Sequence, residues 1–143
     1  MNAPRYDRPA PTEYAESYAR YIGRVPDGNL LEMLAEQGRD LAALIGPLPE
    51  MKGAFSYAPG KWTLKDVLGH MADGERVFSY RALRIARGDK TPLPGFEQDD
   101  WVPNAGSANR TLADLLEELA AVRTATLLLL RHLPPEAVTR KGT

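Results

Sequence analysis

The fold of this protein is decided by one stretch, residues 57–88, which reads YAPGKWTLKDVLGHMADGERVFSYRALRIARG. Its apolar residues recur at the spacing of one helix face. Thr63 stands just before them and can cap the helix, because its hydroxyl accepts a hydrogen bond from a free amide of the first turn. Gly88 follows them at the place where a left-handed residue commonly ends a helix. These signals predict a helix over residues 63–87.

His70 lies at the edge of this apolar face and is one of two histidines in the chain. At 100° per residue, Gly74 and Arg81 fall on nearly the same side of the helix as His70. Gly74 leaves space beside the imidazole, and Asp73 is one helical turn away from it. The row is typical of a pocket wall. A half-buried histidine that bonds to a backbone carbonyl or to water is an alternative interpretation.

Two further apolar stripes at helical spacing predict helices over residues 30–45 and 112–133. Residues 88–110 between the second and third helices are rich in Pro, Gly and Asn. A connection of this length in a compact domain predicts a crossover, so that the third helix starts at the same end as the second. We expect Phe96 and Trp101 to pin the crossover to the bundle. The fold class is therefore all-α.

Composition places the chain among ordinary globular proteins. It has 143 residues, enough for one domain, and we expect residues 1–11 to be disordered. A formal net charge of −1 without a long basic run argues against nucleic-acid binding. There is no cysteine, so disulfides and thiolate metal sites are excluded. Without a membrane-spanning run or a signal sequence, the expected location is the cytoplasm.

The run from Pro59 to Val102 resembles the first conserved block of the DinB-like superfamily, in the branch related to the YfiT proteins. Its hallmarks are a Pro-Gly-Lys-Trp-Thr turn, a Leu-Gly-His helix start, and then Glu-Arg-Val-Phe and Arg-Ala. The similarity extends from about Tyr14 to the last residue. The resemblance implies a bundle of four long helices with a long crossover between the second and third, which holds a divalent metal ion, zinc or nickel, with three histidines.

Only the first of those three ligands has a counterpart here, at His70. The resemblance places the other two in a His-x-x-x-His pair on a last helix, and this chain has no such pair. We therefore expect either a truncated chain or a member that has lost the site, and weak or absent metal binding. The remaining candidates for substrate binding are Arg81, Asp73 and Trp101.

Two functions of different classes follow from these observations. The resemblance implies a metal-dependent S-transferase that acts with a low-molecular-weight thiol, here with an incomplete metal site. In that case Arg81 would bind a carboxylate of the thiol. The alternative is a non-catalytic, stress-related helical module that acts by association of its helix faces.

The end of the third helix favours association. The run Leu127 to Leu130 is apolar on all sides, which is typical of a helix buried on two faces. We therefore expect a homodimer, with this run close to the contact or to the place of the fourth helix. His132 follows at the end of the helix, where a partly charged imidazole favours the negative helix end.

Overall fold

The computed structural model describes residues 4–142, and this part of the chain is helical without a strand. Three long helices dominate it: α2 (Leu30–Ile45), α3 (Leu64–Ala86) and α5 (Leu112–Arg131). The predicted all-α fold is confirmed. The short elements are η1 (Pro11–Glu13), η2 (Glu16–Tyr18), α1 (Ala19–Ile22), η3 (Glu50–Ala54), α4 (Gln98–Trp101), η4 (Val102–Asn104), η5 (Ser107–Asn109) and α6 (Pro135–Val138).

The capping residues fix where the long helices begin. Thr63 accepts a hydrogen bond from the amide of Asp66, and the Asp66 carboxylate accepts one from the amide of Thr63, which completes a capping box. Thr111 accepts from the amide of Asp114 at 3.1 Å. The cap at Thr63 is as predicted. Asn29 caps α2 by accepting from two amides of its first turn.

The ends of α3 and α5 differ slightly from the predicted bounds. Gly88 has a left-handed backbone with φ of 78°, as expected for the residue that ends α3, although α3 itself stops at Ala86. α5 stops at Arg131 rather than at residue 133, because the amides of His132 and Leu133 bond three residues back in a tighter turn. Pro134 follows, and a residue before proline avoids the helical conformation.

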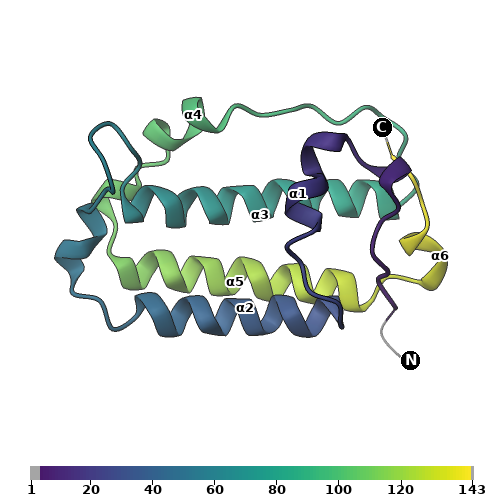
Figure 1. The fold of residues 1–143 in the computed structure, drawn as a ribbon, viewed down its shortest axis with the longest axis horizontal. Coiled ribbons are helices and arrows are strands. Elements are labelled where there is room, and N and C mark those ends of the chain that lie inside the picture. Colours follow the sequence, from purple (N-terminus) through teal and green to yellow (C-terminus); the bar gives the residue numbers. More distant parts are fainter. Residues whose placement is uncertain (1–3, 143) are drawn as a thin grey trace.

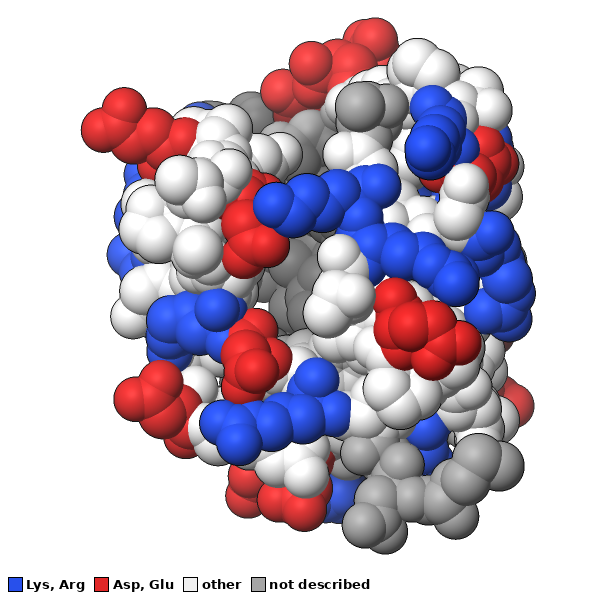
Figure 2. Space-filling model, turned by 90° about the vertical axis from the view of Figure 1, so that its right-hand side faces the viewer, with Lys and Arg blue, Asp and Glu red and all other residues white. Residues whose placement is uncertain are grey.

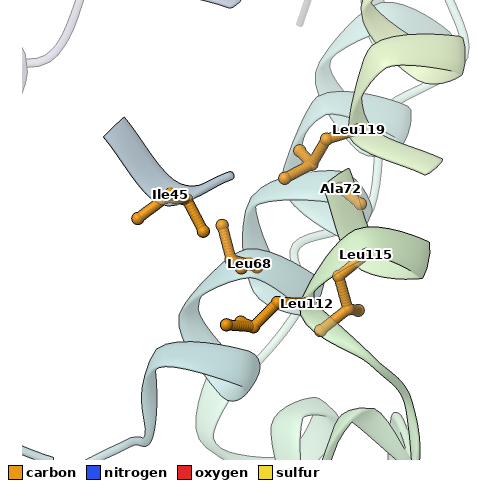
Figure 3. Packing of buried hydrophobic residues seen from close by; sticks show 6 residues of the cluster. All are labelled: Ile45, Leu68, Ala72, Leu112, Leu115 and Leu119. Carbon is orange, nitrogen blue, oxygen red and sulfur yellow. The ribbon is translucent and has the colours of Figure 1, made fainter. Parts of the chain in front are cut away.

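The three long helices pack with α5 next to both α2 and α3 (Figure 1). α3 and α5 run parallel, since Leu68 near the start of α3 packs with Leu115 near the start of α5, and Ala86 at the end of α3 packs with Leu129 and Leu133. The predicted crossover is thus confirmed. The main core lies at the end of the bundle where both α3 and α5 begin. Figure 3 shows its buried residues, which are Ile45, Leu68, Ala72, Leu112, Leu115 and Leu119.

The crossover is held against α3 by close packing at Gly69. A Cβ atom at this position would clash with the Ser107 hydroxyl, so only glycine allows η5 to approach α3 this closely. Ser107 and Val102 are the buried residues of the crossover. Phe96 and Trp101 pack on each other with ring centroids 4.8 Å apart, and Trp101 remains exposed.

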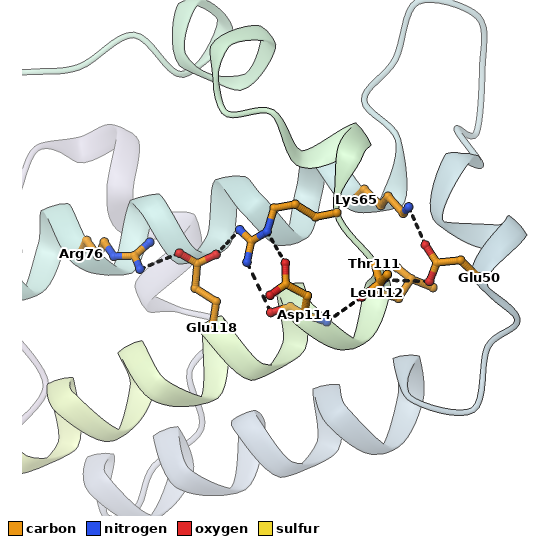
Figure 4. A network of polar contacts seen from close by, with 8 residues as sticks. Glu50, Lys65, Arg76, Thr111, Leu112, Asp114 and Glu118 are labelled. Carbon is orange, nitrogen blue, oxygen red and sulfur yellow. Dashed lines mark hydrogen bonds and ion pairs between the residues drawn. The ribbon is translucent and has the colours of Figure 1, made fainter.

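A chain of ion pairs joins the parallel helices along one side (Figure 4). Glu118 of α5 bonds to Arg76 of α3 and to Arg110, and Arg110 also bonds to Asp114. The hydrogen bond from Arg110 is the main cause that lowers the pKa of the Glu118 carboxyl. Near the start of both helices, Glu50 bonds to Lys65 at 2.5 Å and accepts from the amide of Leu112 at 3.0 Å.

The opposite end of the bundle carries the N-terminal segment and α6. Residues 4–10 lie along this end, where the Tyr6 hydroxyl donates to the Leu130 carbonyl at 2.7 Å. Burial raises the pKa of this phenol. Arg8 donates to the carbonyls of Ile22 and Val25 at 2.6 Å. Figure 2 shows positive and negative side chains interspersed over this end.

The lengths and compositions of the helices bear on membrane insertion. Within residues 4–142, none of them is both long and apolar enough to cross a bilayer.

Candidate functional site

A cleft of about 460 Å³ opens between the three long helices, and we call it the His70 cleft. Its walls are mainly apolar, with four polar or charged side chains besides the imidazole. The lining residues are Leu34, His70, Met71, Gly74, Glu75, Phe78, Ser79, Ala82, Arg123, Thr126 and Leu130. A volume of this size and a lining of this kind are typical of small-molecule sites.

His70 lies half-buried in the wall of this cleft. Its ring packs on Trp62 with centroids 4.9 Å apart and planes tilted by 52°. Neither ring nitrogen is hydrogen-bonded to a residue of the range 4–142. The imidazole is therefore positioned by packing alone, and both of its nitrogens are available to a ligand.

Gly74 supplies the opening beside the imidazole. It is buried, yet a Cβ atom built at this position would meet no other atom within 4 Å. The exposed ring of Phe78 stands one turn further along α3 and forms the rim. A Cβ atom at position 74 is therefore accommodated beside the cleft without a clash.

An ion pair between α3 and α5 forms the polar part of the cleft. The Nε of Arg123 donates to the two carboxylate oxygens of Glu75 at 2.7 and 3.0 Å. Its Nη1 donates to the Leu34 carbonyl at 2.5 Å and to Gln37 at 3.2 Å, both on α2. Only 16% of the Arg123 side chain and 14% of the Glu75 side chain are exposed. One guanidinium thus joins all three long helices.

A second hollow lies on the other side of this ion pair, and we call it the α2–α5 groove. Met71, Glu75 and Arg123 line both hollows, so they form the partition between them. The Arg123 side chain packs on α2 at Gly38, where an added Cβ atom would lie in ordinary van der Waals contact with it, at 3.6 Å. The other lining residues are mostly apolar and include Leu41, Leu44, Leu116, Leu119, Ala120 and Leu127.

Arg81 lies outside the lining of the His70 cleft. Its Nη2 donates to the carbonyl of Pro94 in the crossover at 2.6 Å. The guanidinium also lies over the rings of Phe78 and Phe96, 5.7 and 5.9 Å from their centroids. Arg81 therefore ties the crossover to the rim of the cleft, because the crossover passes over the face of α3 that carries it.

Asp73 and Trp101 also lie outside the lining. The Asp73 carboxylate forms an ion pair with Arg76 at 3.7 Å, and Trp101 packs on Phe96 in the crossover. Of the four residues suggested by the sequence to bind a metal ion or substrate, the cleft contains His70 alone, together with Gly74, which was expected to leave space beside the imidazole. His132, the other histidine, is exposed at the end of α5. With a rise of about 1.5 Å per helical residue, it lies roughly 20 Å from His70 along the bundle axis.

The donor set of the cleft does not fit the three-histidine metal site of the resemblance. His70 is the single imidazole in the lining, and the Glu75 carboxylate is bonded to Arg123. No group of three His, Cys, Asp or Glu side chains in residues 4–142 is arranged to hold a metal ion. A catalytic zinc site needs three protein ligands. These residues supply one free ligand, two fewer than such a site requires.

Two residues of the site, Glu75 and Arg123, were not singled out from the sequence. The signal was nevertheless present, because each charge interrupts an apolar stripe. Glu75 falls on the row of Met71 and Phe78 at spacings of four and three, and Arg123 falls likewise between Leu119 and Thr126. Two opposite charges on the inner faces of two predicted neighbours indicate a buried ion pair.

Comparison with known proteins agrees with this architecture. A family profile described as the DinB superfamily matches residues 33–143, which is more than half of the chain. No match was found among curated proteins or among solved structures. The matched range contains the three long helices from Met33 onward, the crossover and every residue of the His70 cleft. The chain belongs to the DinB superfamily.

Proposed function

We propose that this DinB-superfamily protein binds a small, largely apolar molecule in the His70 cleft. The proposal is supported by the imidazole of His70, whose two nitrogens have no hydrogen-bond partner in residues 4–142 and which lies in a mainly apolar cleft. Clefts that combine apolar walls with a few polar groups are the usual small-molecule sites of proteins. Gly74 supports the proposal, because it keeps the space beside the imidazole open.

A more specific proposal, which names a reaction, is S-transfer with a low-molecular-weight thiol. It is supported by membership of the family together with the resemblance described above. Because this chain contains no cysteine, any thiol that takes part must belong to the ligand. The activity would require ligands for a metal ion beyond those that the described residues supply.

Replacing Gly74 by Leu tests the proposed binding site. We expect the variant to fold at least as stably, because leucine is favoured over glycine inside a helix by about 1 kcal/mol and its Cβ position is open. The new side chain fills the cleft, so binding of the neutral apolar dye Nile red, followed by fluorescence, should fall at least about tenfold.

Gly95→Leu is the matched control, since it makes the same change in an open part of the crossover outside the cleft. It should leave dye binding unchanged. Equal binding by Gly74→Leu and by the unaltered protein would show that the dye binds elsewhere and would contradict the proposed site.

A second prediction concerns metal content. Affinity at such sites comes from several preplaced ligands and from the groups that orient them, and His70 alone offers neither. Protein purified without added metal should therefore carry well under one equivalent of zinc or nickel by elemental analysis, and His70→Ala should not lower that value. Stoichiometric metal that His70→Ala removes would show that carboxylates or a second copy complete the site.

A second candidate function, association of helix faces, is favoured by the α2–α5 groove. Leu44 is 69% exposed at its edge, and Leu127 lies in its lining. The groove also carries the exposed, oppositely charged neighbours Arg39 and Asp40, and a symmetric pair of copies can match such charges with each other. We propose a homodimer through this groove. Of the run from Leu127 to Leu130, Leu127 faces it, whereas Leu130 lines the His70 cleft.

Light scattering at micromolar concentration tests the homodimer. We expect the mass of two chains for the unaltered protein and of one chain for Leu44→Asp, because a charge in an apolar interface is costly. Leu128→Asp is the control, since Leu128 is also exposed but lies outside the groove lining. A monodisperse monomer for the unaltered protein would overturn this candidate.

A further inference from the structure

The Arg123 guanidinium, in the polar part of the His70 cleft, indicates which class of small molecule binds there. This inference rests on the function proposed above. The guanidinium of Arg123 has three nitrogens, and two of them are used within the protein: Nε by Glu75 and Nη1 by α2. Nη2 donates to no residue in the range 4–142. No side-chain nitrogen or oxygen there is both buried from solvent and unpaired, so Nη2 is open to solvent.

Arg123 is held in place for binding by the bonds it already makes. Glu75 holds Nε from α3, while the Leu34 carbonyl and Gln37 hold Nη1 from α2. Arg123 lines both the His70 cleft and the α2–α5 groove, and its side chain is only 16% exposed, so the free donor lies in a hollow rather than on an open surface. An oriented guanidinium recognises carboxylates better than a flexible cation, because little rotamer freedom is lost on binding.

The other groups of the cleft favour an acceptor at Arg123 and an apolar body beside it. Glu75 and Ala82 both line the cleft from α3. Because an α-helix rises about 1.5 Å per residue, this part of the lining is roughly 10 Å long. Phe78, Ala82 and Leu130 provide apolar surface along this length. The hydroxyls of Ser79 and Thr126 already donate to carbonyls of their own helices, so they add no competing donor.

We propose that the His70 cleft selects small aliphatic carboxylic acids of about six to eight carbons in total, and that the free Nη2 of Arg123 opens into this cleft and binds the carboxylate. Arg81, which the sequence suggested for this role, bonds to the crossover instead. His70 lies at the end of the lining away from Ala82 and Leu130, on the carboxylate side of the ligand.

Hexanoate and 1-hexanol form a matched pair of probes, because they share the aliphatic body and differ in the carboxylate. We expect NMR titration of the unaltered protein to give a dissociation constant about tenfold lower for hexanoate, the effect of one or two charge-assisted hydrogen bonds. Hexanol reports on the cleft by itself. If neither probe shifts the cleft resonances, the proposed function fails; if both bind equally, only the present inference fails.

Two variants test the assignment to Arg123. The double variant Arg123→Met with Glu75→Met removes both charges together, so that neither is left unpaired. It should lose the tenfold preference while its affinity for hexanol is kept. Glu75→Gln retains the guanidinium but removes the neighbouring negative charge, so hexanoate should bind a few-fold more tightly than in the unaltered protein.

The opposite directions of these two effects distinguish recognition from a structural role, which would weaken binding in both variants. Arg81→Lys serves as the control and should leave both affinities unchanged, because Arg81 lies outside the lining. Retention of the tenfold preference in the double variant, or its loss in Arg81→Lys, would overturn the proposal.

Discussion

Replacing Leu115 by Ala should lower the free energy of unfolding by about 2–5 kcal/mol, the range for large-to-small changes in a packed core. Leu115, near the start of α5, is 1% exposed and packs towards α3 in the cluster with Leu68 and Leu112 (Figure 3). Small domains have a total stability of about 5–15 kcal/mol. The loss would therefore move the denaturation midpoint far enough to be read in a urea titration followed by circular dichroism.

Leu128→Ala is the matched control for this change. It makes the same substitution on the same helix, but Leu128 is 48% exposed. Because little apolar surface is lost there, the free energy of unfolding should change by less than about 0.5 kcal/mol. Equal effects of the two substitutions would show that α5 does not pack through the Leu115 face.

Replacing Arg123 alone by Met should cost about 2–4 kcal/mol, close to the range for breaking a buried ion pair. The cost arises because the Glu75 carboxylate, 14% exposed, is left without its partner, and the Leu34 carbonyl loses its donor. The double variant Arg123→Met with Glu75→Met should recover most of this loss, since removing both charges leaves no buried charge unpaired.

A double-mutant cycle measured by urea unfolding gives the coupling between the two residues. Arg5→Met provides the control, because the Arg5–Asp7 pair is 89% and 75% exposed and exposed pairs contribute about 0–1 kcal/mol. If Arg123→Met were as mild as Arg5→Met, the pair would not join the three helices in solution.

The elements of the fold could be predicted because their signals are local. Thr63 and Thr111 cap their helices within one turn, and Gly88 ends α3 by its own backbone conformation. The parallel run of α3 and α5 followed from the length of the connection between them. Each of these inferences needed only neighbouring residues or a count of residues.

The residues that line the cleft could not be predicted in the same way, because contacts between residues far apart in the sequence bring them together. Glu75 and Arg123 are 48 positions apart, and only the register of two parallel helices brings them together. Arg81 illustrates the same limit. The helical period predicts the direction in which Arg81 leaves the axis of α3. It does not predict that the guanidinium donates a hydrogen bond to the carbonyl of Pro94, 13 positions later.

Mapping where a small apolar ligand binds would test directly whether the His70 cleft is a binding site. Amide chemical shifts of the protein would be followed during titration with 1-hexanol, which lacks a charge and so tests the cleft without the Arg123 assignment. We expect the largest shifts at Gly74, Phe78 and Leu130, around the His70 cleft. Largest shifts at Ala35, Leu44 and Leu127, in the α2–α5 groove, would contradict it.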